Sequence, residues 1–345
     1  KMQAKNLDID YYNLGFELKQ TKWMFLSDYK EGKWDEGKLI PFGPIEISPA
    51  ANIFSYGQGI FEGMKALNTK DNHIVLFRPI ENAKRFNKSA SRVAMPNFNE
   101  EKFLNSVKEI VLANKEYIPP YDSGGSLYIR PIMIGSGPML GVSPAKEFKM
   151  IIFCSPVGSY FHDGFKAIDL LISKKYTRSS QGGTGFSKMC GNYAGTMKPA
   201  IEAKIQGYEQ VIYLDSIHMK YINEVGAANF CAIIDNTLVT PKMDGTILEG
   251  ITLRSVLELA RKKLKIKVEE RDISYEELFD NNCTEAFCTG TAAVLTPIGS
   301  ITCENKIKTY NDKQPGEITT KLYNLLTGIQ RLDIKDEFDW IEILE

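Results

Sequence analysis

The pattern of apolar positions predicts two amphipathic helices in the first third of the chain. Between Pro79 and Pro96, apolar side chains recur three or four positions apart, which is the spacing of one helix face. These side chains are Ile80, Ala83, Phe86, Ala90 and Val93. Proline is favoured at the first helical position and disfavoured inside a helix, so Pro79 begins this helix and Pro96 ends it. Asn99 is a favourable N-cap for a second helix, which ends before Pro119.

Short apolar runs predict β-strands in the rest of the chain. The first half has two such runs, over 126–135 and 148–155. In the second half, strands are expected over 167–173, 210–215, 229–234 and 284–288, and helices over 193–206 and 252–264. No internal repeat occurs. This order predicts an α/β fold with mixed α+β character in both halves, and it does not fit a barrel.

The length of 345 residues is greater than that of one ordinary domain and indicates two. The stretch 156–165 contains two glycines, a proline and several aromatic residues, which is typical of a linker or hinge loop. We therefore expect a smaller N-terminal domain over 1–160, an interdomain loop over 161–171 and a larger C-terminal domain over 172–345.

Composition and charge exclude several classes of function. Lysine and arginine number 42 against 43 aspartate and glutamate, a net charge of −1, so neither nucleic acid nor a membrane is an expected partner. The six cysteines form no C-x-x-C pair and there are only three histidines, so no metal site is expected. Unpaired cysteines of this kind fit a cytoplasmic protein.

The densest cluster of unusual residues surrounds Lys188, in a stretch with glycines at 182, 183, 185 and 191. Such a lysine is most often a solvated surface residue. A nucleotide-binding P-loop would need Gly-Lys-Ser/Thr, whereas Lys188 lies between Ser187 and Met189. A lysine among small residues can also be desolvated, which suits an amine nucleophile or a Schiff-base lysine.

A Schiff-base lysine would imply pyridoxal phosphate, which needs an acid at its ring nitrogen and a site for its phosphate. Glu224 is the candidate acid, the N-terminus of the helix after Gly250 is the candidate phosphate site, and Arg85 is the candidate cation. A second set of donors lies at 289–292. Each has an ordinary alternative: an exposed turn glutamate, a plain helix start and a solvated helix arginine.

Seven segments together resemble one family, the branched-chain amino acid aminotransferases of pyridoxal-phosphate fold type IV. They occur in the family's order at 54–65, 76–79, 127–131, 188–199, 223–230, 248–254 and 290–297. The resemblance covers nearly the whole chain and implies a two-domain fold like that of D-amino acid aminotransferases. It also implies a homodimer, with pyridoxal 5′-phosphate as the cofactor.

The resemblance implies a role for each matching residue. Lys188 would form the internal aldimine and then carry the proton between substrate Cα and cofactor. The other expected cofactor contacts are Tyr193 near the phenolic oxygen, Glu224 at the pyridine nitrogen, Leu248 on the ring, and Arg85, Ile251, Thr252 and Thr291 at the phosphate. The expected substrate contacts are Tyr56, Phe61 and Tyr160 around the side chain, and Tyr128, Ala292 and Ala293 at the α-carboxylate.

Arg130 lies inside a predicted strand, where a buried arginine is costly unless it meets an anion. The resemblance implies that this anion is the side-chain carboxylate of glutamate, and the alternative is a structural salt bridge to a neighbouring acid. Mammalian members of the family have a redox-active C-x-x-C where this chain has Ala293 and Thr296. We therefore expect no thiol switch there, and we interpret Cys190 as a packing residue.

The function implied is ping-pong transamination. L-leucine, L-isoleucine or L-valine would give its 2-oxo acid, and 2-oxoglutarate would then be converted to L-glutamate. D-amino acid aminotransferases and aminodeoxychorismate lyases share the fold type and are the nearest alternatives. A nucleotide-binding module on 182–188 and a non-catalytic cofactor-binding regulator are more distant ones.

Overall fold

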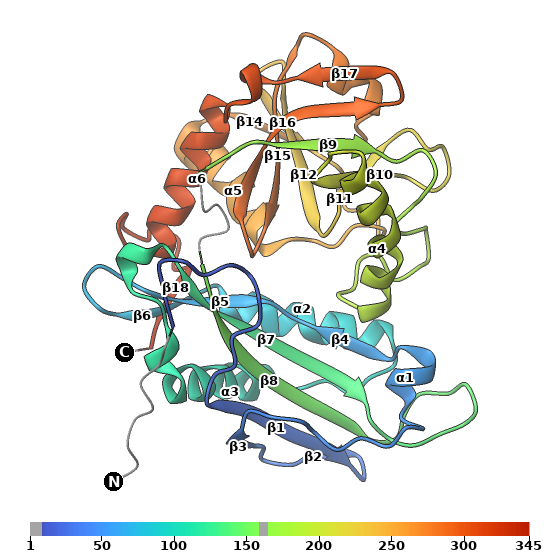
Figure 1. Ribbon diagram of the computed structural model, residues 1–345, viewed down its shortest axis with the longest axis vertical. Coiled ribbons are helices and arrows are strands. Elements are labelled where there is room, and N and C mark those ends of the chain that lie inside the picture. Colours follow the sequence, from blue (N-terminus) through green and yellow to red (C-terminus); the bar gives the residue numbers. More distant parts are fainter. Residues whose placement is uncertain (1–8, 159–164, 345) are drawn as a thin grey trace.

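The computed structural model describes residues 9–158 and 165–344, which form two nine-stranded β-sheets with helices packed against them (Figure 1). The first sheet has the order β18-β6-β5-β7-β8-β1-β2, with β3 beside β1 and β4 beside β7. The second has the order β11-β10-β9-β16-β15-β12-β13-β14, with β17 beside β16. The α/β prediction with mixed character is confirmed.

The first sheet is antiparallel throughout its described pairings. Its strands are β1 (Trp23–Lys30), β2 (Lys33–Trp34), β3 (Lys38–Pro41), β4 (Gly59–Phe61), β5 (Met64–Asn68), β6 (Ile74–Phe77), β7 (Ser126–Gly135), β8 (Phe148–Val157) and β18 (Ile341–Ile343). The helices of this part are α1 (Asn52–Tyr56), α2 (Pro79–Arg92) and α3 (Glu100–Ala113), followed by 3₁₀ turns at Lys115–Tyr117 and Tyr121–Ser123.

The second sheet mixes parallel and antiparallel pairs, because β9 runs parallel to both β10 and β16. Its strands are β9 (Ile168–Ile172), β10 (Gln210–Leu214), β11 (Ile222–Val225), β12 (Ala228–Ile234), β13 (Thr237–Thr240), β14 (Lys267–Glu270), β15 (Cys283–Gly290), β16 (Val294–Cys303) and β17 (Lys306–Thr309). The helices are α4 (Cys190–Ile205), α5 (Ile251–Leu259) and α6 (Glu317–Gln330), with shorter turns at Ala260–Leu264, Tyr275–Phe279 and Asn311–Lys313.

The two predicted helices of the first third are confirmed and pack against the first sheet. The Asn99 side chain accepts a hydrogen bond from the Lys102 N–H and so caps α3 as expected. The apolar faces of α2 and α3 meet at Phe86 and Phe103, whose rings are fully buried with centroids 5.4 Å apart. Burial of each phenyl ring stabilises this layer by about 1.5–3 kcal/mol.

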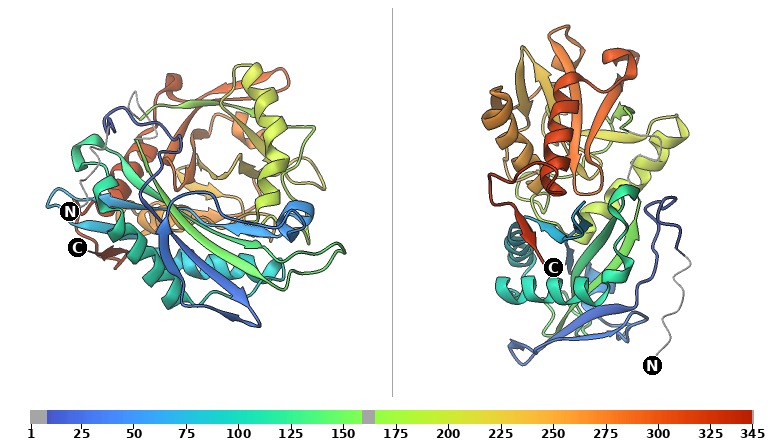
Figure 2. Two further views of the ribbon diagram at one scale, coloured as in Figure 1. Left: turned by 60° about the horizontal axis from the view of Figure 1, so that its bottom comes forward. Right: turned by 90° about the vertical axis from the view of Figure 1, so that its left-hand side faces the viewer.

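The inner strands of the second sheet are buried on both faces, so they are largely apolar without alternation, whereas β14 and β17 are polar. In β12, Cys231 and Ile233 pack against α5 and α6, whereas Phe230 and Ala232 belong to the core on the opposite face. Figure 2 shows α6 lying along this sheet and leading to the C-terminal strand.

The structure differs from the expected domain division at two points. Strand β9 begins at Ile168, inside the expected loop 161–171, because Ile168–Ile172 pairs with β10 and β16. The C-terminal segment Ile341–Ile343 pairs with β6 and therefore belongs to the first sheet, away from the second sheet that precedes it in sequence (Figure 1). Most of the expected hinge loop, residues 159–164, lies outside the described residues.

Candidate active site

Lys188 lies where the two halves of the molecule meet, directly before α4. Its backbone N–H donates to Ser89 Oγ on α2 at 2.8 Å, and its carbonyl accepts the Phe61 N–H of β4 at 3.1 Å. Its Nζ lies 3.1 Å from the Tyr193 hydroxyl and 4.7 Å from the centre of the Phe61 ring. The backbone of Lys188 is therefore held by α2 and β4, while its amine lies between two aromatic rings.

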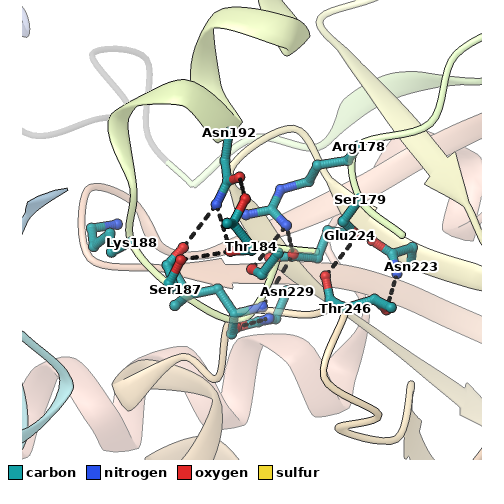
Figure 3. A network of polar contacts seen from close by, with 12 residues as sticks. Arg178, Ser179, Thr184, Ser187, Lys188, Asn192, Asn223, Glu224, Asn229 and Thr246 are labelled. Carbon is teal, nitrogen blue, oxygen red and sulfur yellow. Dashed lines mark hydrogen bonds and ion pairs between the residues drawn. The ribbon is translucent and has the colours of Figure 1, made fainter. Parts of the chain in front are cut away.

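The loop before Lys188 is held by a small polar network, seen in Figure 3. The Asn192 side-chain amide donates to the carbonyls of Thr184 and Ser187 at 2.8 and 2.9 Å. The Ser187 hydroxyl donates back to the Thr184 carbonyl at 2.7 Å. The backbone polar groups of this loop are thus paired locally, which holds Lys188 at a defined position.

Glu224 is a buried strand residue, so the alternative of an exposed turn glutamate is wrong. It lies in β11 with 2% of its surface exposed, and its Oε2 is 2.5 Å from Arg178 Nη1 (Figure 3). Burial raises the pKa of Glu224 to about 7, while the Arg178 guanidinium opposes that rise by stabilising the carboxylate. The site thus holds a carboxylate whose ionised form is supported by a neighbouring positive charge.

Two further side chains lie in a row with Glu224 across the second sheet. Glu224 pairs with Asn229 on β12, which in turn pairs with Thr289 on β15, so the three side chains share one face. Asn229 Nδ2 donates to the Leu248 carbonyl at 2.8 Å, and the Leu248 N–H donates to Glu224 at 3.3 Å. The row therefore fixes the segment that leads into α5. The Thr289 hydroxyl is buried, and among the described residues it has no hydrogen-bond partner.

The N-terminus of α5 is the expected phosphate site, and its geometry suits an anion. Helix α5 begins at Ile251 without a side-chain cap, so its first N–H groups are left for a ligand. A Cβ at Gly250 would lie 2.2 Å from Asn229 Oδ1, so the approach to the helix needs glycine. Ile251, Thr252 and Thr291 line one cavity of about 430 Å³, and neither Lys188 nor Glu224 is among its lining residues.

Arg85 is held beside α5 by an acid that the sequence interpretation did not assign. Its Nε and Nη2 lie 2.7 and 2.9 Å from the two carboxylate oxygens of Glu62, which is fully buried. Its Nη1 donates to the Glu249 carbonyl at 3.1 Å, next to the start of α5. Burial opposes ionisation of Glu62, but Arg85 lowers the pKa of Glu62 below its usual value. The solvated alternative for Arg85 is wrong.

Phe61, Tyr128 and Arg130 come together on the first sheet, as expected for the substrate pocket. The Arg130 guanidinium lies over both rings, 5.0 Å from the centre of Phe61 and 5.1 Å from that of Tyr128. Its Nη2 is 3.1 Å from the Tyr128 hydroxyl, and its buried Nε has no partner among the described residues. In the described part of the chain Arg130 forms no ion pair with an acid, so the salt-bridge alternative is not supported. This guanidinium is available to an anion.

The remaining residues expected at the substrate and the cofactor lie in different parts of the structure. Ala292 and Ala293 lie with Thr291 in the hairpin loop between β15 and β16, facing the cavity. Tyr56 ends α1 at the surface, where its hydroxyl donates to the carbonyl of Leu140. Leu248 is buried beside Glu224. Tyr160 lies outside the described residues.

Sequence reasoning missed Arg178 and Glu62, and it gave Lys65 and Asn229 no role, although the last three lie in segments that carry the resemblance. No local signal could have found Arg178, because its partner Glu224 is 46 positions away.

Within 9–158 and 165–344, no three His, Cys, Asp or Glu side chains lie close enough to hold a metal ion. In the same ranges no helix is long and apolar enough to cross a bilayer.

Comparisons with known proteins show which family the chain belongs to. The profile of the family described as Amino-transferase class IV matches residues 59–301. Branched-chain-amino-acid aminotransferase 5 of Arabidopsis thaliana, a chloroplastic protein, is 44% identical over 334 residues, covering 96% of this chain and 80% of its own length. Branched-chain-amino-acid aminotransferase 2 of Bacillus subtilis is 41% identical over 336 residues, covering 96% and 92%.

Solved structures show the same fold. The branched-chain amino acid aminotransferase of Escherichia coli superposes with a TM-score of 0.79 at 23% identity, over 94% of this chain and all of that one. The Thermobaculum terrenum enzyme in its PLP-bound holo-form has a TM-score of 0.80 at 22% identity, over 94% and 99%. The chain therefore belongs to the class IV aminotransferases. Within that family it groups with the branched-chain amino acid aminotransferases.

Proposed function

We propose that this protein transaminates L-leucine, L-isoleucine and L-valine with 2-oxoglutarate, using pyridoxal 5′-phosphate and Lys188. Branched-chain transamination and the cofactor follow from the family. The observation that supports the assignment to these residues is that Lys188 lies near enough to Glu224 to favour its ionised form, and that the Leu248 N–H, shortly before α5, donates to Glu224. The ping-pong order is part of the proposal, because one pocket must admit the amino acids and 2-oxoglutarate in turn.

The residues present fit pyridoxal phosphate. The uncapped start of α5 and Thr252 suit a phosphate, and the ion-paired Glu224 suits a protonated pyridine nitrogen. Within the described part of the chain, the Thr289 hydroxyl and one nitrogen of Arg178 are buried without a hydrogen-bond partner. Buried polar groups are normally paired, so a bound ligand would supply the missing partners. When bound, the cofactor supplies an electron sink for the bond broken at the substrate Cα.

The chain's own residues supply the proton transfer and the charge control. The Lys188 amine removes the Cα proton and returns it, a role that requires the neutral amine and a fixed position. Tyr193 lies 3.1 Å from that amine and orients it. Glu224, whose ionised form the Arg178 guanidinium favours against the effect of burial, would stabilise positive charge at the pyridine nitrogen.

The substrate pocket explains how one site takes both leucine and glutamate. Phe61 provides apolar surface for a branched side chain, and the Arg130 guanidinium lies over the rings of Phe61 and Tyr128. A carboxylate on the substrate side chain can pair with this guanidinium, which has no acidic partner in the described structure. An arginine over aromatic rings also presents an apolar face when no carboxylate is bound.

Arg130→Met is expected to separate the two substrates. The KM for 2-oxoglutarate should rise about 100-fold, because a charge-assisted pair of about 1.5–3 kcal/mol is lost. The KM for L-leucine should change less than threefold, since methionine keeps the apolar contact. Steady-state kinetics with each substrate varied in turn measure both values. A control is Lys33→Met, which removes an exposed cation from β2 of the same sheet. Equal losses for both substrates would contradict this role of Arg130.

We include a homodimer in the proposal. The supporting observation is an apolar stripe on α4, where Met197, Ile201 and Ile205 are 63%, 61% and 80% exposed at intervals of four residues. Leu140 and Val142 of the first domain are also exposed, at 94% and 84%. Apolar side chains at this density on one helix face are typical of a protein interface.

We also propose a cytoplasmic location. All six cysteines are free thiols, which agrees with a reducing compartment.

Replacing Ile201 by aspartate should convert the dimer to a monomer. A charge in the middle of an apolar interface is desolvated without a partner, which costs several kcal/mol per dimer. Light scattering coupled to size-exclusion chromatography should give about twice the 38.9 kDa chain mass for the unmodified protein and the single mass for the variant. A monomeric unmodified protein would refute the dimer. A variant that remains a dimer would place the interface elsewhere.

A further inference from the structure

A single lysine of the first sheet is attached to the hairpin loop that carries the expected carboxylate site. Lys65 lies on β5, and its Nζ donates to the carbonyl of Ala292 at 2.5 Å, across 227 positions of sequence. The same loop makes a second contact with that strand edge, from Thr291 Oγ1 to the Gly63 carbonyl at 3.4 Å. Two bonds therefore join the β15–β16 loop to the first domain.

The conformation of this loop needs external support. Gly290 pairs with Val294, so Thr291, Ala292 and Ala293 form a three-residue hairpin loop. Val294 has a φ of 65°, in the left-handed region that β-branched residues adopt only at a cost of about 1–3 kcal/mol. Such a conformation persists when surrounding contacts over-determine it. Lys65 and Gly63 supply those contacts.

The Lys65 ammonium has no competing acidic partner. In the described ranges it forms no ion pair with a carboxylate, and it donates instead to the Ala292 carbonyl. Burial, together with nearby Arg331, lowers the pKa of Lys65 to about 7. Burying a charged lysine near another cation costs folding free energy. The polar contact that Lys65 makes in this position is its hydrogen bond to the loop.

We propose that Lys65 is a positioning residue for substrate binding: by holding the Ala292 carbonyl, it turns the peptide groups of the Thr291–Ala293 loop so that their N–H groups face the substrate α-carboxylate. The side chain also faces the same side of the sheet as Tyr128, because the two residues are directly paired on β5 and β7. Tyr128 and the Thr291–Ala293 loop would thus contact the same carboxylate from different sheets. Lys65 would hold the loop at a fixed distance from Tyr128.

This inference rests on the proposed function and predicts a distinctive kinetic pattern. Every substrate carries an α-carboxylate, so Lys65→Met should raise the KM for both L-leucine and 2-oxoglutarate about tenfold, with kcat within threefold of wild type. Arg130→Met, by contrast, affects 2-oxoglutarate alone. Methionine keeps the aliphatic stem of lysine and so limits any loss of packing.

The direct test is the affinity of the holoenzyme for 4-methylvalerate, a leucine-shaped carboxylate without an amino group, measured by calorimetry. Lys65→Met should raise its Kd about tenfold, while Lys65→Arg, which keeps a cationic donor, should stay within threefold of wild type. Lys70→Met, in the exposed turn after the same strand, is the matched control and should leave the Kd unchanged.

A Kd for Lys65→Met within twofold of wild type would overturn the inference, as would an equal loss in Lys65→Arg. If Lys65→Met folds poorly, as judged by its melting temperature, Lys65→Gln is measured in its place with the same expectations. Failure of the proposed function is recognised separately, since the wild-type holoenzyme would then fail to react with L-leucine at all.

Discussion

Lys188→Ala is expected to lower transamination by about 10⁴-fold or more while the fold survives. In the proposed function the lysine amine takes the Cα proton, and its Nζ lies between Phe61 and Tyr193. Alanine retains the backbone N–H that donates to Ser89 and the carbonyl that accepts from Phe61. The loop should therefore keep its position, and the loss should appear in kcat.

Rapid mixing of the variant holoenzyme with L-leucine measures this directly, with the melting temperature as the check on folding. Lys198→Ala is the matched control: Lys198 lies on the same helix, α4, with 74% of its side chain exposed, and should retain full activity. More than about 1% of wild-type turnover in Lys188→Ala, without added amine, would show that another group performs the proton transfer.

Glu224→Gln is expected to lower kcat about 100- to 1,000-fold. The amide keeps the shape of the carboxylate but carries no charge to hold a proton on the pyridine nitrogen. The substitution also leaves the Arg178 guanidinium buried and unpaired, which should cost about 3–5 kcal/mol of folding free energy. Activity and stability therefore fall together in this variant, for two different reasons.

The double variant Glu224→Gln/Arg178→Met separates the two effects. Removing both members of a buried ion pair restores much of the stability, because no charge is left unpaired. Activity should remain low, since the carboxylate is still absent. Chemical denaturation and steady-state kinetics on the wild type, both single variants and the double variant complete the cycle. Recovered activity in the double variant would contradict the role assigned to Glu224.

Local sequence patterns predicted the secondary elements well where one residue type decides the outcome. Pro79 begins α2 and Asn99 caps α3 as expected, because both effects act within one helical turn. The strand predicted over 126–135 coincides with β7, since a buried strand needs a continuous apolar run. In these places local propensity and tertiary packing favour the same structure.

The parts that were missed depend on contacts between distant segments. The C-terminal strand β18 has only three residues, and its place in the first sheet is set by pairing with β6. The strand predicted over 167–173 matches β9, but the loop expected over 161–171 overlaps it, because the neighbours of β9 in the sheet, β10 and β16, come from much later parts of the chain. Periodicity within one segment carries no information about such partners.

The same distinction applies to the candidate site. Lys188, Glu224 and Arg85 were singled out because family motifs surround them, and in the structure Glu224 and Arg85 are buried and form ion pairs. Their partners Arg178 and Glu62 were given no role, since the need for a partner follows only from burial. A buried charge nearly always requires an opposite charge. The sequence could therefore predict that Glu224 needs a cation and Arg85 an acid, but it could not predict which residues supply them.

In the proposed function Lys188 carries the cofactor, and the site acts on branched-chain L-amino acids. The visible absorption spectrum of the purified holoenzyme, recorded before and after addition of L-leucine without an oxo acid, tests it most directly. We predict a yellow band that converts to the pyridoxamine spectrum with L-leucine and stays unchanged with D-alanine. A band that responds to D-alanine alone, or no band after addition of pyridoxal phosphate, would contradict the account.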